Sequence, residues 1–272
     1  MPHTSLHRTP MQGPAQILTD ISDGIGTITL HHEAKRNALS EHMVQEMIQA
    51  FDQFKQADVR VAILRALPGI KVWSAGHDVT ELPAGGHDPL SWQDSLRTLI
   101  REVEVFPGPV IALIEGGVWG GACELVFACD MVVATPEATF AATPAKLGVP
   151  YNVTGLLTFL NVAPPHIAKE LLFTGRPMTA ARLERQGVIN GVVPAEHIGA
   201  HVFEMARTIA QNAPLAVSVM KEQLRILAGA NAVSPGDFER IQSLRRVVYN
   251  SQDYAEGIQA FKEKRLPHYH GE

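Results

Sequence analysis

An alternation of apolar strand patterns and amphipathic helix patterns in the first half of the chain most constrains how this sequence can fold. Runs rich in β-branched residues at 17–20 and 26–31 flank a polar turn, which predicts an opening hairpin. A helix expected at 41–56 precedes an apolar run at 59–66, and a helix expected at 90–106 precedes an apolar run at 109–115. Strands joined by helices favour parallel pairing with right-handed crossovers, so the sequence predicts an α/β fold.

The second half of the chain is predominantly helical in its pattern. Beyond Thr154 the apolar residues recur at helical spacing, and the last four expected helices span 198–212, 214–228, 237–249 and 253–264. No long linker or fixed-period repeat divides the chain. We therefore expect a flexible tail at 1–13, an α/β core at 14–200 and a C-terminal helical region at 201–272.

The composition excludes several classes of function. The 272 residues carry a formal net charge of −5 with scattered lysines and arginines, so no surface for a nucleic-acid backbone is expected. No uninterrupted apolar run reaches the roughly 20 residues that span a bilayer, and residues 1–13 lack the apolar core of a secretory signal. Cys123 and Cys129 lie in a strongly apolar stretch, where we expect small core residues and no disulfide. These features favour a soluble, cytoplasmic protein without nucleic-acid or membrane partners.

Two glycine-rich segments, 74–78 and 116–124, each follow an apolar strand. Glycine permits unusual φ values and close backbone approach, and a helix that begins near Gly121 adds unpaired N–H donors. One backbone N–H from each loop can then point into a common cavity, which is the arrangement of an oxyanion hole. Each segment by itself is more typical of an ordinary strand-to-helix turn. Neither has the spacing of a dinucleotide-binding or phosphate-binding loop, which disfavours nucleotide chemistry.

Together with other segments, these loops resemble the crotonase superfamily of coenzyme A thioester enzymes. The resemblance covers residues 17–267 and is carried by KRNALS at 35–40, SAGHD at 74–78, GGACE at 120–124 and SQDYAEG at 251–257. It implies a spiral of ββα units in the core and C-terminal helices through which subunits form trimers or hexamers. It also implies that the backbone amides of His77 and Gly121 are the oxyanion donors. Coenzyme A is then part of the substrate, and no separate cofactor is expected.

A missing carboxylate narrows the reaction. Family hydratases commonly use two glutamates, one to activate water and one to handle the other proton. Glu124 occupies the first position, but the second falls at Ala145, and no carboxylate occurs in residues 138–168. The pattern is most similar to decarboxylating members of the superfamily, on segments such as KVWSAGHD at 71–78 and LGVPYN at 147–152. This resemblance implies a carbon–carbon lyase that converts methylmalonyl-CoA or malonyl-CoA to propionyl-CoA or acetyl-CoA.

Four residues are candidates for the catalytic centre: His77, Gly121, Tyr151 and Glu124. For His77 we favour the backbone amide as the oxyanion donor; an imidazole that protonates the enolate is the alternative. With the resemblance, Tyr151 is expected to orient the substrate carboxylate through one hydrogen bond, whereas without it a surface-loop tyrosine is the better interpretation. Glu124 is either an active-site carboxylate or an anchor in the first turn of its helix.

Further residues are candidates for substrate binding, namely Lys35, Arg36, Ala38, Ala75, Gly76, Asp78, Trp119, Gly120, Pro150 and Lys264. The three cations among them suit the phosphates of coenzyme A and are otherwise solvated surface charges. Trp119 shapes the acyl pocket or belongs to the core, and Asp78 is expected to cap the segment after its loop. The twelve histidines show no metal-binding spacing, so no metal is expected.

Two other functions stay open at this point. An enoyl-CoA hydratase or isomerase would use Glu124, and hydration of crotonyl-CoA that is lost in Glu124→Gln would identify it. A non-catalytic crotonase-fold binding protein, such as one that binds RNA, is disfavoured by the acidic charge balance and by the lack of a lysine-rich helix. Filter binding at physiological salt distinguishes this alternative.

Overall fold

The computed structural model describes residues 14–83, 85–229 and 233–272, so the tail expected at 1–13 lies outside the described residues. The strands are β1 Ile17–Ser22, β2 Ile25–Leu30, β3 Val61–Ala66, β4 Val72–Ser74, β5 Val110–Ile114, β6 Gly117–Trp119, β7 Met131–Ala134, β8 Thr139–Ala141, β9 Met178–Thr179 and β10 Gly191–Val192. Within these residues they form a larger sheet, β1-β2-β3-β5-β7-β10, and a smaller sheet, β4-β6-β8-β9. The larger sheet is parallel from β2 to β10, and β1 pairs antiparallel with β2.

The chain winds as a spiral between the two sheets. A strand of the larger sheet is followed by one of the smaller sheet and then by a helix, as in β3, β4 and α2 (Ser95–Val105). The same order recurs in β5, β6 and α3 (Gly121–Ala128), and in β7, β8 and α4 (Val153–Val162). Because β3, β5 and β7 are neighbours and β4, β6 and β8 are neighbours, each ββα unit advances the spiral by one strand. The predicted α/β spiral is confirmed.

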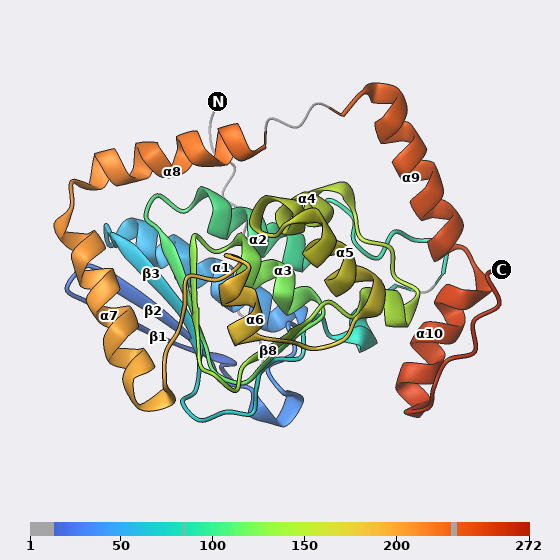
Figure 1. Ribbon diagram of the computed structural model, residues 1–272, viewed down its shortest axis with the longest axis horizontal. Helices are drawn as coiled ribbons and strands as arrows, with labels where there is room; N and C mark the ends of the chain where they lie inside the picture. The colour runs from blue at the N-terminus through green and yellow to red at the C-terminus, as the bar shows by residue number, and fades with distance from the viewer. Residues whose placement is uncertain (1–13, 84, 230–232) are drawn as a thin grey trace.

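Helices cover both faces of the larger sheet (Figure 1). α1 (Glu41–Gln56) lies with α2 and α3 on one face, and α7 (Ala195–Gln211) lies on the other. Alternate residues of β3 divide between these faces, since Ala62 and Leu64 belong to the main core and Val61 and Ile63 to the cluster beneath α7. A strand that is buried on both faces must be apolar at successive positions, which explains the continuous apolar runs of the sequence.

Most predicted elements are confirmed, and the differences have local causes. α1 begins after Ser40, whose hydroxyl accepts a hydrogen bond from Met43 N. The helix expected at 90–106 begins only at Ser95, because Asp94 caps it. Residues 72–74 predict the short strand β4, but β6 and β8 were not predicted, and β6 lies within the glycine-rich segment 116–124. Cys123 and Cys129 are buried and free, as expected.

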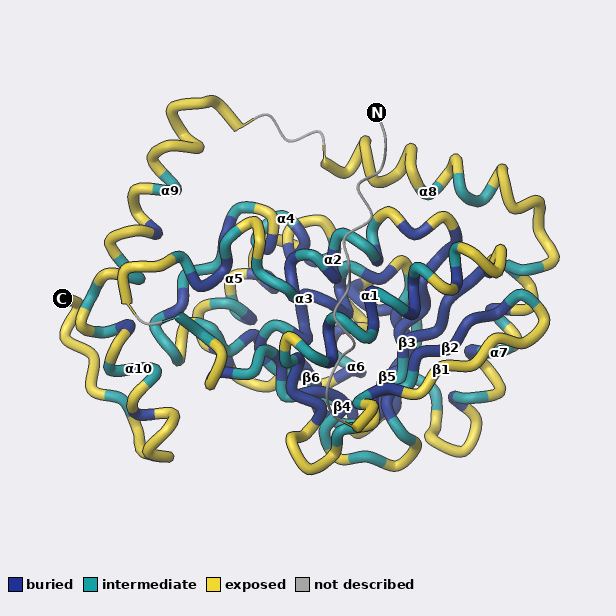
Figure 2. The backbone as a smooth tube through the Cα atoms, turned by 180° about the vertical axis from the view of Figure 1, so that it is seen from behind, coloured by how far each residue is buried: buried dark blue, intermediate teal, exposed yellow. Residues whose placement is uncertain are grey.

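The C-terminal helical region begins later than the sequence indicates. The expected boundary between residues 200 and 201 falls inside α7, which packs on the larger sheet through Ile198, Val202 and Ala206. The region that stands away from the body therefore starts with α8 (Pro214–Ala228), and α9 (Pro235–Tyr249) follows. Both helices are exposed along most of their length (Figure 2). None of the helices in the described part of the chain is long and apolar enough to cross a membrane.

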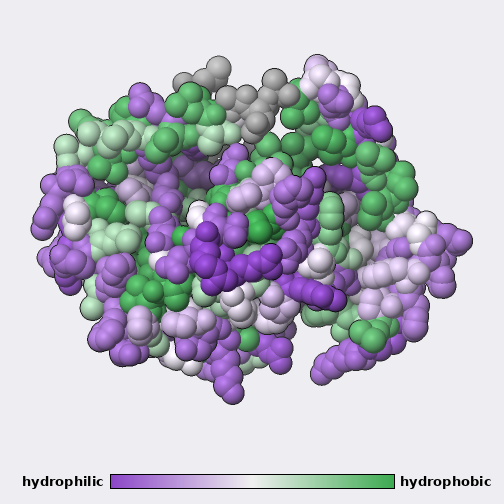
Figure 3. Space-filling view, in the orientation of Figure 1, coloured by the Kyte–Doolittle hydropathy of each residue, from purple (hydrophilic) through white to green (hydrophobic). Residues whose placement is uncertain are grey.

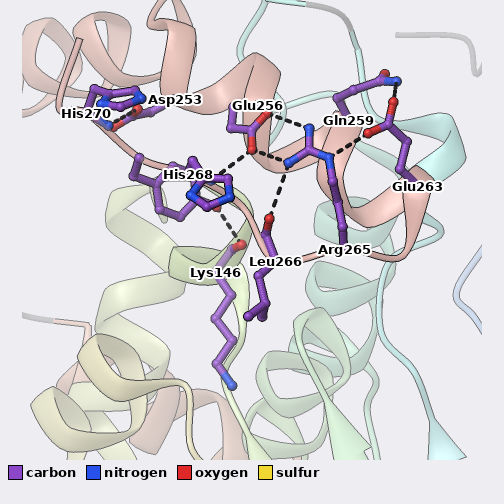
Figure 4. A network of polar contacts seen from close by, with 10 residues as sticks. Lys146, Asp253, Glu256, Gln259, Glu263, Arg265, Leu266, His268 and His270 are labelled. Atoms are coloured by element: carbon purple, nitrogen blue, oxygen red, sulfur yellow. Dashed lines mark hydrogen bonds and ion pairs between the residues drawn. The ribbon is translucent and has the colours of Figure 1, made fainter.

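Specific polar contacts join this region to the body. On α8, Lys221 Nζ lies 2.8 Å from Asp130 Oδ2 and 3.0 Å from the carbonyl oxygens of Val103 and Gly108. After α10 (Gln252–Glu263), the chain folds back along that helix (Figure 4), and the polar contacts involve Asp253, Glu256, Gln259, Glu263, Arg265, His268 and His270. The Tyr269 hydroxyl donates to Lys146 O at 2.6 Å, which holds this segment against the short helix η3 (Pro144–Leu147).

Candidate active site

The two glycine-rich loops lie side by side because the strands that precede them are neighbours. β4 and β6 pair in parallel, so their loops leave the smaller sheet at the same edge. Gly76 has a φ of +85°, and a Cβ at this position would lie 2.3 Å from Trp119 O and 2.9 Å from Gly121 N. Only glycine permits this approach of the two backbones. The expectation that the two loops meet is confirmed.

The backbone amides of His77 and Gly121 come together at this contact. A Cβ on Gly121 would lie 3.7 Å from His77 N. Gly76 O accepts a hydrogen bond from Leu39 N, and a trans peptide directs its N–H opposite to its C=O, so the His77 N–H faces away from Leu39. Gly121 is the first residue of α3, where an N–H has no partner inside the helix. Within residues 14–83, 85–229 and 233–272, neither amide has a hydrogen-bond acceptor.

The basic segment 35–39 is fastened to the first of these loops. Ser74 Oγ donates to Asn37 O at 2.7 Å, and Ala75 N donates to Arg36 O at 2.9 Å. These bonds place Lys35 and Arg36 beside the loop that carries His77.

A cavity of about 330 Å³ opens beside the two amides. Its wall includes all four predicted catalytic residues and six predicted binding residues, Lys35, Arg36, Ala38, Ala75, Asp78 and Gly120. Among the residues that the structure describes, four other predicted positions are not part of the wall: Gly76, Trp119, Pro150 and Lys264. Gly76 instead forms the loop contact, the Trp119 indole lies against Gly117, and Lys264 is exposed at the end of α10.

Glu124 lies in the cavity wall and is paired with an arginine that sequence analysis missed. Glu124 on α3 is 2 % exposed, Arg97 on α2 is 4 % exposed, and Arg97 Nη1 donates to Glu124 Oε1. Burial raises the pKa of Glu124 to about 7, although the charge of Arg97 opposes this shift. The sequence did contain a signal for this buried arginine. Arg97 lies next to the apolar stripe of its helix, which Leu96, Leu99 and Ile100 form.

His77 is held by a second residue that sequence analysis missed. Its Nε2 lies 2.8 Å from Asp94 Oδ1, and Asp94 Oδ2 accepts a hydrogen bond from Arg97 N at 3.0 Å. One carboxylate therefore caps α2 and orients the imidazole. Burial opposes protonation of His77, but the hydrogen bond and charge of Asp94 outweigh it and raise the pKa of the imidazole.

Tyr151 points into the interior and not to the surface. Its ring packs edge-on against Phe159 with centroids 5.4 Å apart. Tyr151 and Glu124 both border Gly155 at the start of α4, where a Cβ would lie 2.7 Å from the tyrosine ring and 2.9 Å from Glu124 Oε1. The phenol oxygen is buried and has no hydrogen-bond partner in the part of the chain that is described. Burial raises the pKa of Tyr151 well above its usual value, so the phenol is a neutral O–H donor.

The remaining carboxylates of the wall are engaged. Asp78 accepts a hydrogen bond from Thr80 N at 3.0 Å, which confirms the predicted cap, and it lies 3.9 Å from Lys35 Nζ. Asp94 binds His77, as described above. Ala145 lies in η3 with its side chain exposed. No carboxylate in the described cavity wall is therefore without a partner and able to serve as the second base of a hydratase.

Comparison with known proteins agrees with this geometry. The model of the enoyl-CoA hydratase/isomerase family matches residues 20–272. Methylmalonyl-CoA decarboxylase of Escherichia coli (strain K12) is 45 % identical over 247 residues, which cover 91 % of this chain and 95 % of that protein. Carnitinyl-CoA dehydratase of Salmonella arizonae is 34 % identical, over 87 % of this chain and 92 % of that protein.

Solved structures show the same relationship. A methylmalonyl-CoA decarboxylase in complex with 2-nitronate-propionyl-CoA superimposes with a TM-score of 0.93 and 43 % identity, over 96 % of this chain and all of that chain. Another structure, complexed with 2S-carboxypropyl-CoA, has a TM-score of 0.93 and 42 % identity over the same shares. The fold, the paired loops and these relatives together show that the chain belongs to the enoyl-CoA hydratase/isomerase family, the crotonase family that its sequence resembles.

Proposed function

We propose that this chain is a decarboxylase that converts methylmalonyl-CoA or malonyl-CoA to propionyl-CoA or acetyl-CoA and carbon dioxide. The observation that carries the proposal is the neutral, unpartnered hydroxyl of Tyr151 in a cavity wall whose carboxylates are engaged. This equipment suits a substrate that brings its own carboxylate. The 45 % identity to a methylmalonyl-CoA decarboxylase supports the same reaction.

The chemistry follows from the positions of the donors. When the bond between the α-carbon and the carboxylate breaks, carbon dioxide leaves and the electron pair passes into the thioester, which becomes an enolate. The amides of His77 and Gly121 would donate to the enolate oxygen, and each such donor lowers the barrier by roughly 3 to 4 kcal/mol in other enzymes. The α-carbon then takes up a proton. Tyr151 would hold the carboxylate out of the thioester plane without neutralising it, in a pocket that is poor in water.

Binding of coenzyme A requires cations outside the reaction centre. Lys35 and Arg36 lie in the wall beside the loop of His77 and are placed to meet phosphate groups. Phe261 on α10 contributes an apolar contact to the same cavity, and Lys264 follows it at the end of the helix. Coenzyme A is part of the substrate in this proposal, so the reaction needs no separate cofactor.

The proposed activity is tested by incubating the purified protein with methylmalonyl-CoA and following the thioesters by mass spectrometry. The expected product is propionyl-CoA, lighter by one carbon dioxide. Absence of this product at every enzyme concentration would refute the proposal. Hydration of crotonyl-CoA that depends on Glu124 would instead support a hydratase.

We also infer that the protein assembles into a homotrimer or a hexamer of two trimers. α8 exposes a series of large apolar side chains (Figure 3), namely Leu215, Val219, Met220, Leu224, Ile226 and Leu227. Exposed apolar surface of this extent is typical of an interface. Sedimentation equilibrium should give three or six times the mass of the chain, and a monomer at micromolar concentration would contradict the inference.

The free thiols of Cys123 and Cys129 fit a reducing compartment such as the cytoplasm.

A further inference from the structure

The Arg97–Glu124 ion pair occupies a place where the proposed reaction needs a neutral wall. Both side chains line the cavity and both are almost completely buried, at 4 % and 2 % exposure. Removing two charges from water is costly, and well-packed apolar residues often replace such a pair without loss of stability. Stability alone therefore does not account for this pair at the reaction site.

An unpaired arginine in this wall would work against decarboxylation. A guanidinium binds a carboxylate through two parallel charge-assisted hydrogen bonds. The substrate carboxylate must lose its negative charge as it becomes carbon dioxide, so a cation that binds it stabilises the ground state more than the transition state. Interactions of that kind tighten binding and slow the chemical step.

The structure places Glu124 between the arginine and the tyrosine. Arg97 comes from α2, Glu124 from α3 and Tyr151 from the turn before α4, and these helices pack in that order. Arg97 Nη1 donates to Glu124 Oε1, and the same oxygen and the tyrosine ring both lie within 3 Å of the Cβ position of Gly155. Glu124 thus neutralises the guanidinium beside the free phenol of Tyr151.

We propose that Glu124 is a positioning residue that masks the charge of Arg97, so that the substrate carboxylate is held by the neutral phenol of Tyr151 and not by the guanidinium. The inference rests on the proposed decarboxylation and adds to it a reason why this family position carries a glutamate in a chain without a second catalytic carboxylate. It also assigns a function to Arg97.

The test compares two ligands of which only one carries a carboxylate. 2-Carboxypropyl-CoA carries a carboxylate that cannot leave, and propionyl-CoA carries none. Glu124→Gln keeps the shape of the side chain and an acceptor for Arg97, but it leaves one uncompensated positive charge. We expect calorimetry to show that this variant binds 2-carboxypropyl-CoA about tenfold more tightly or better, with little change for propionyl-CoA. Both KM and kcat for methylmalonyl-CoA should fall.

The double variant Arg97→Gln/Glu124→Gln is the matched control, because it removes both charges and keeps a neutral hydrogen-bonding pair. Its kcat should be at least about tenfold above that of Glu124→Gln. Equal weakening of both ligands in Glu124→Gln, or a double variant no more active than the single one, would overturn the proposal. Carbon dioxide release by the unmodified protein is measured first. If no carbon dioxide is released, the proposed function fails. If carbon dioxide is released but Glu124→Gln does not distinguish the two ligands, only the proposed masking of Arg97 by Glu124 is refuted.

A measurement on the unmodified protein provides an independent test that does not depend on the folding of a variant. Burial raises the pKa of Glu124 to about 7, so acidification from pH 8 to 6 removes the mask. Arg97 and Glu104 on α2, Asp94 at the N-cap of α2, and Tyr151 all interact electrostatically with Glu124, and His77 lies in the same cavity. We expect the affinity for 2-carboxypropyl-CoA, relative to propionyl-CoA, to rise as the pH falls through about 7. Asp94→Asn, in which His77 loses the carboxylate that raises its pKa, should retain this step but at a lower pH, because Asp94 also raises the pKa of Glu124. If the ratio of the two ligand affinities does not change with pH, the proposed masking of Arg97 is contradicted.

Discussion

Gly76 is the contact point of the two loops, and Gly76→Ala is therefore the sharpest test of how the site is built. The residue has a φ of +85°, a region that L-residues rarely adopt, and an added methyl group would lie 2.3 Å from Trp119 O and 2.9 Å from Gly121 N. Both neighbours are backbone atoms, so rotation of a side chain cannot relieve the clash. The loops that carry the two amides must move apart.

The size of the effect follows from these distances. Ordinary van der Waals contact begins at 3.4 Å, so the methyl group and Trp119 O must separate by about 1 Å. A displacement of about 1 Å in a catalytic site can cost roughly 100-fold in rate, and loss of one oxyanion donor costs about 100-fold to 1000-fold in kcat. We expect a fall in kcat within that range. The free energy of unfolding should fall by about 1 to 3 kcal/mol because of the strained φ.

The assay is the release of carbon dioxide from methylmalonyl-CoA, with urea unfolding measured in parallel. Gly69→Ala is the matched control, because its φ is +74° but nothing lies within 4 Å of its Cβ position. This control shares the backbone strain without the clash, so it should lose stability and keep kcat within a few-fold. The reasoning is refuted if Gly76→Ala retains kcat within a few-fold, or if Gly69→Ala loses as much activity.

Three further predictions concern other parts of the molecule. Tyr151→Phe should lower kcat for methylmalonyl-CoA by about 10-fold to 100-fold and leave propionyl-CoA affinity unchanged, as measured by steady-state kinetics and calorimetry; unchanged kcat would exclude the phenol from the reaction. Lys221→Met should lower the free energy of unfolding in urea by about 2 to 3 kcal/mol, since Lys221 is 9 % exposed and bonded to Asp130, whereas the exposed Lys262→Met should change it by less than about 0.5 kcal/mol. Gly257→Ala should raise KM several-fold by displacing α10 from the cavity, because its methyl group would lie 2.4 Å from Leu147 O; an unchanged KM would show that α10 does not shape the site.

The order of the elements and the class of fold were within reach of the sequence alone. Patterns of period two and of helical period are local, and they located α1, β3, β5 and α8 to within a residue or two. The two glycine-rich loops were also found, because glycine after a strand indicates that the backbone at that residue needs an unusual φ or a close approach. β6 was missed because it lies within the glycine-rich segment 116–124, which the sequence indicates as a loop.

Only the tertiary structure shows which residue Glu124 is paired with. Its sequence position was compatible with an active-site carboxylate or with a helix anchor, and the pairing with Arg97 depends on the packing of α2 against α3. The same packing brings Asp94, a residue with a local role as a helix cap, onto the imidazole of His77. Charge pairs of this kind join residues that lie far apart in the chain, and burial determines their strength. Contacts between such distant residues leave no periodic pattern in the sequence.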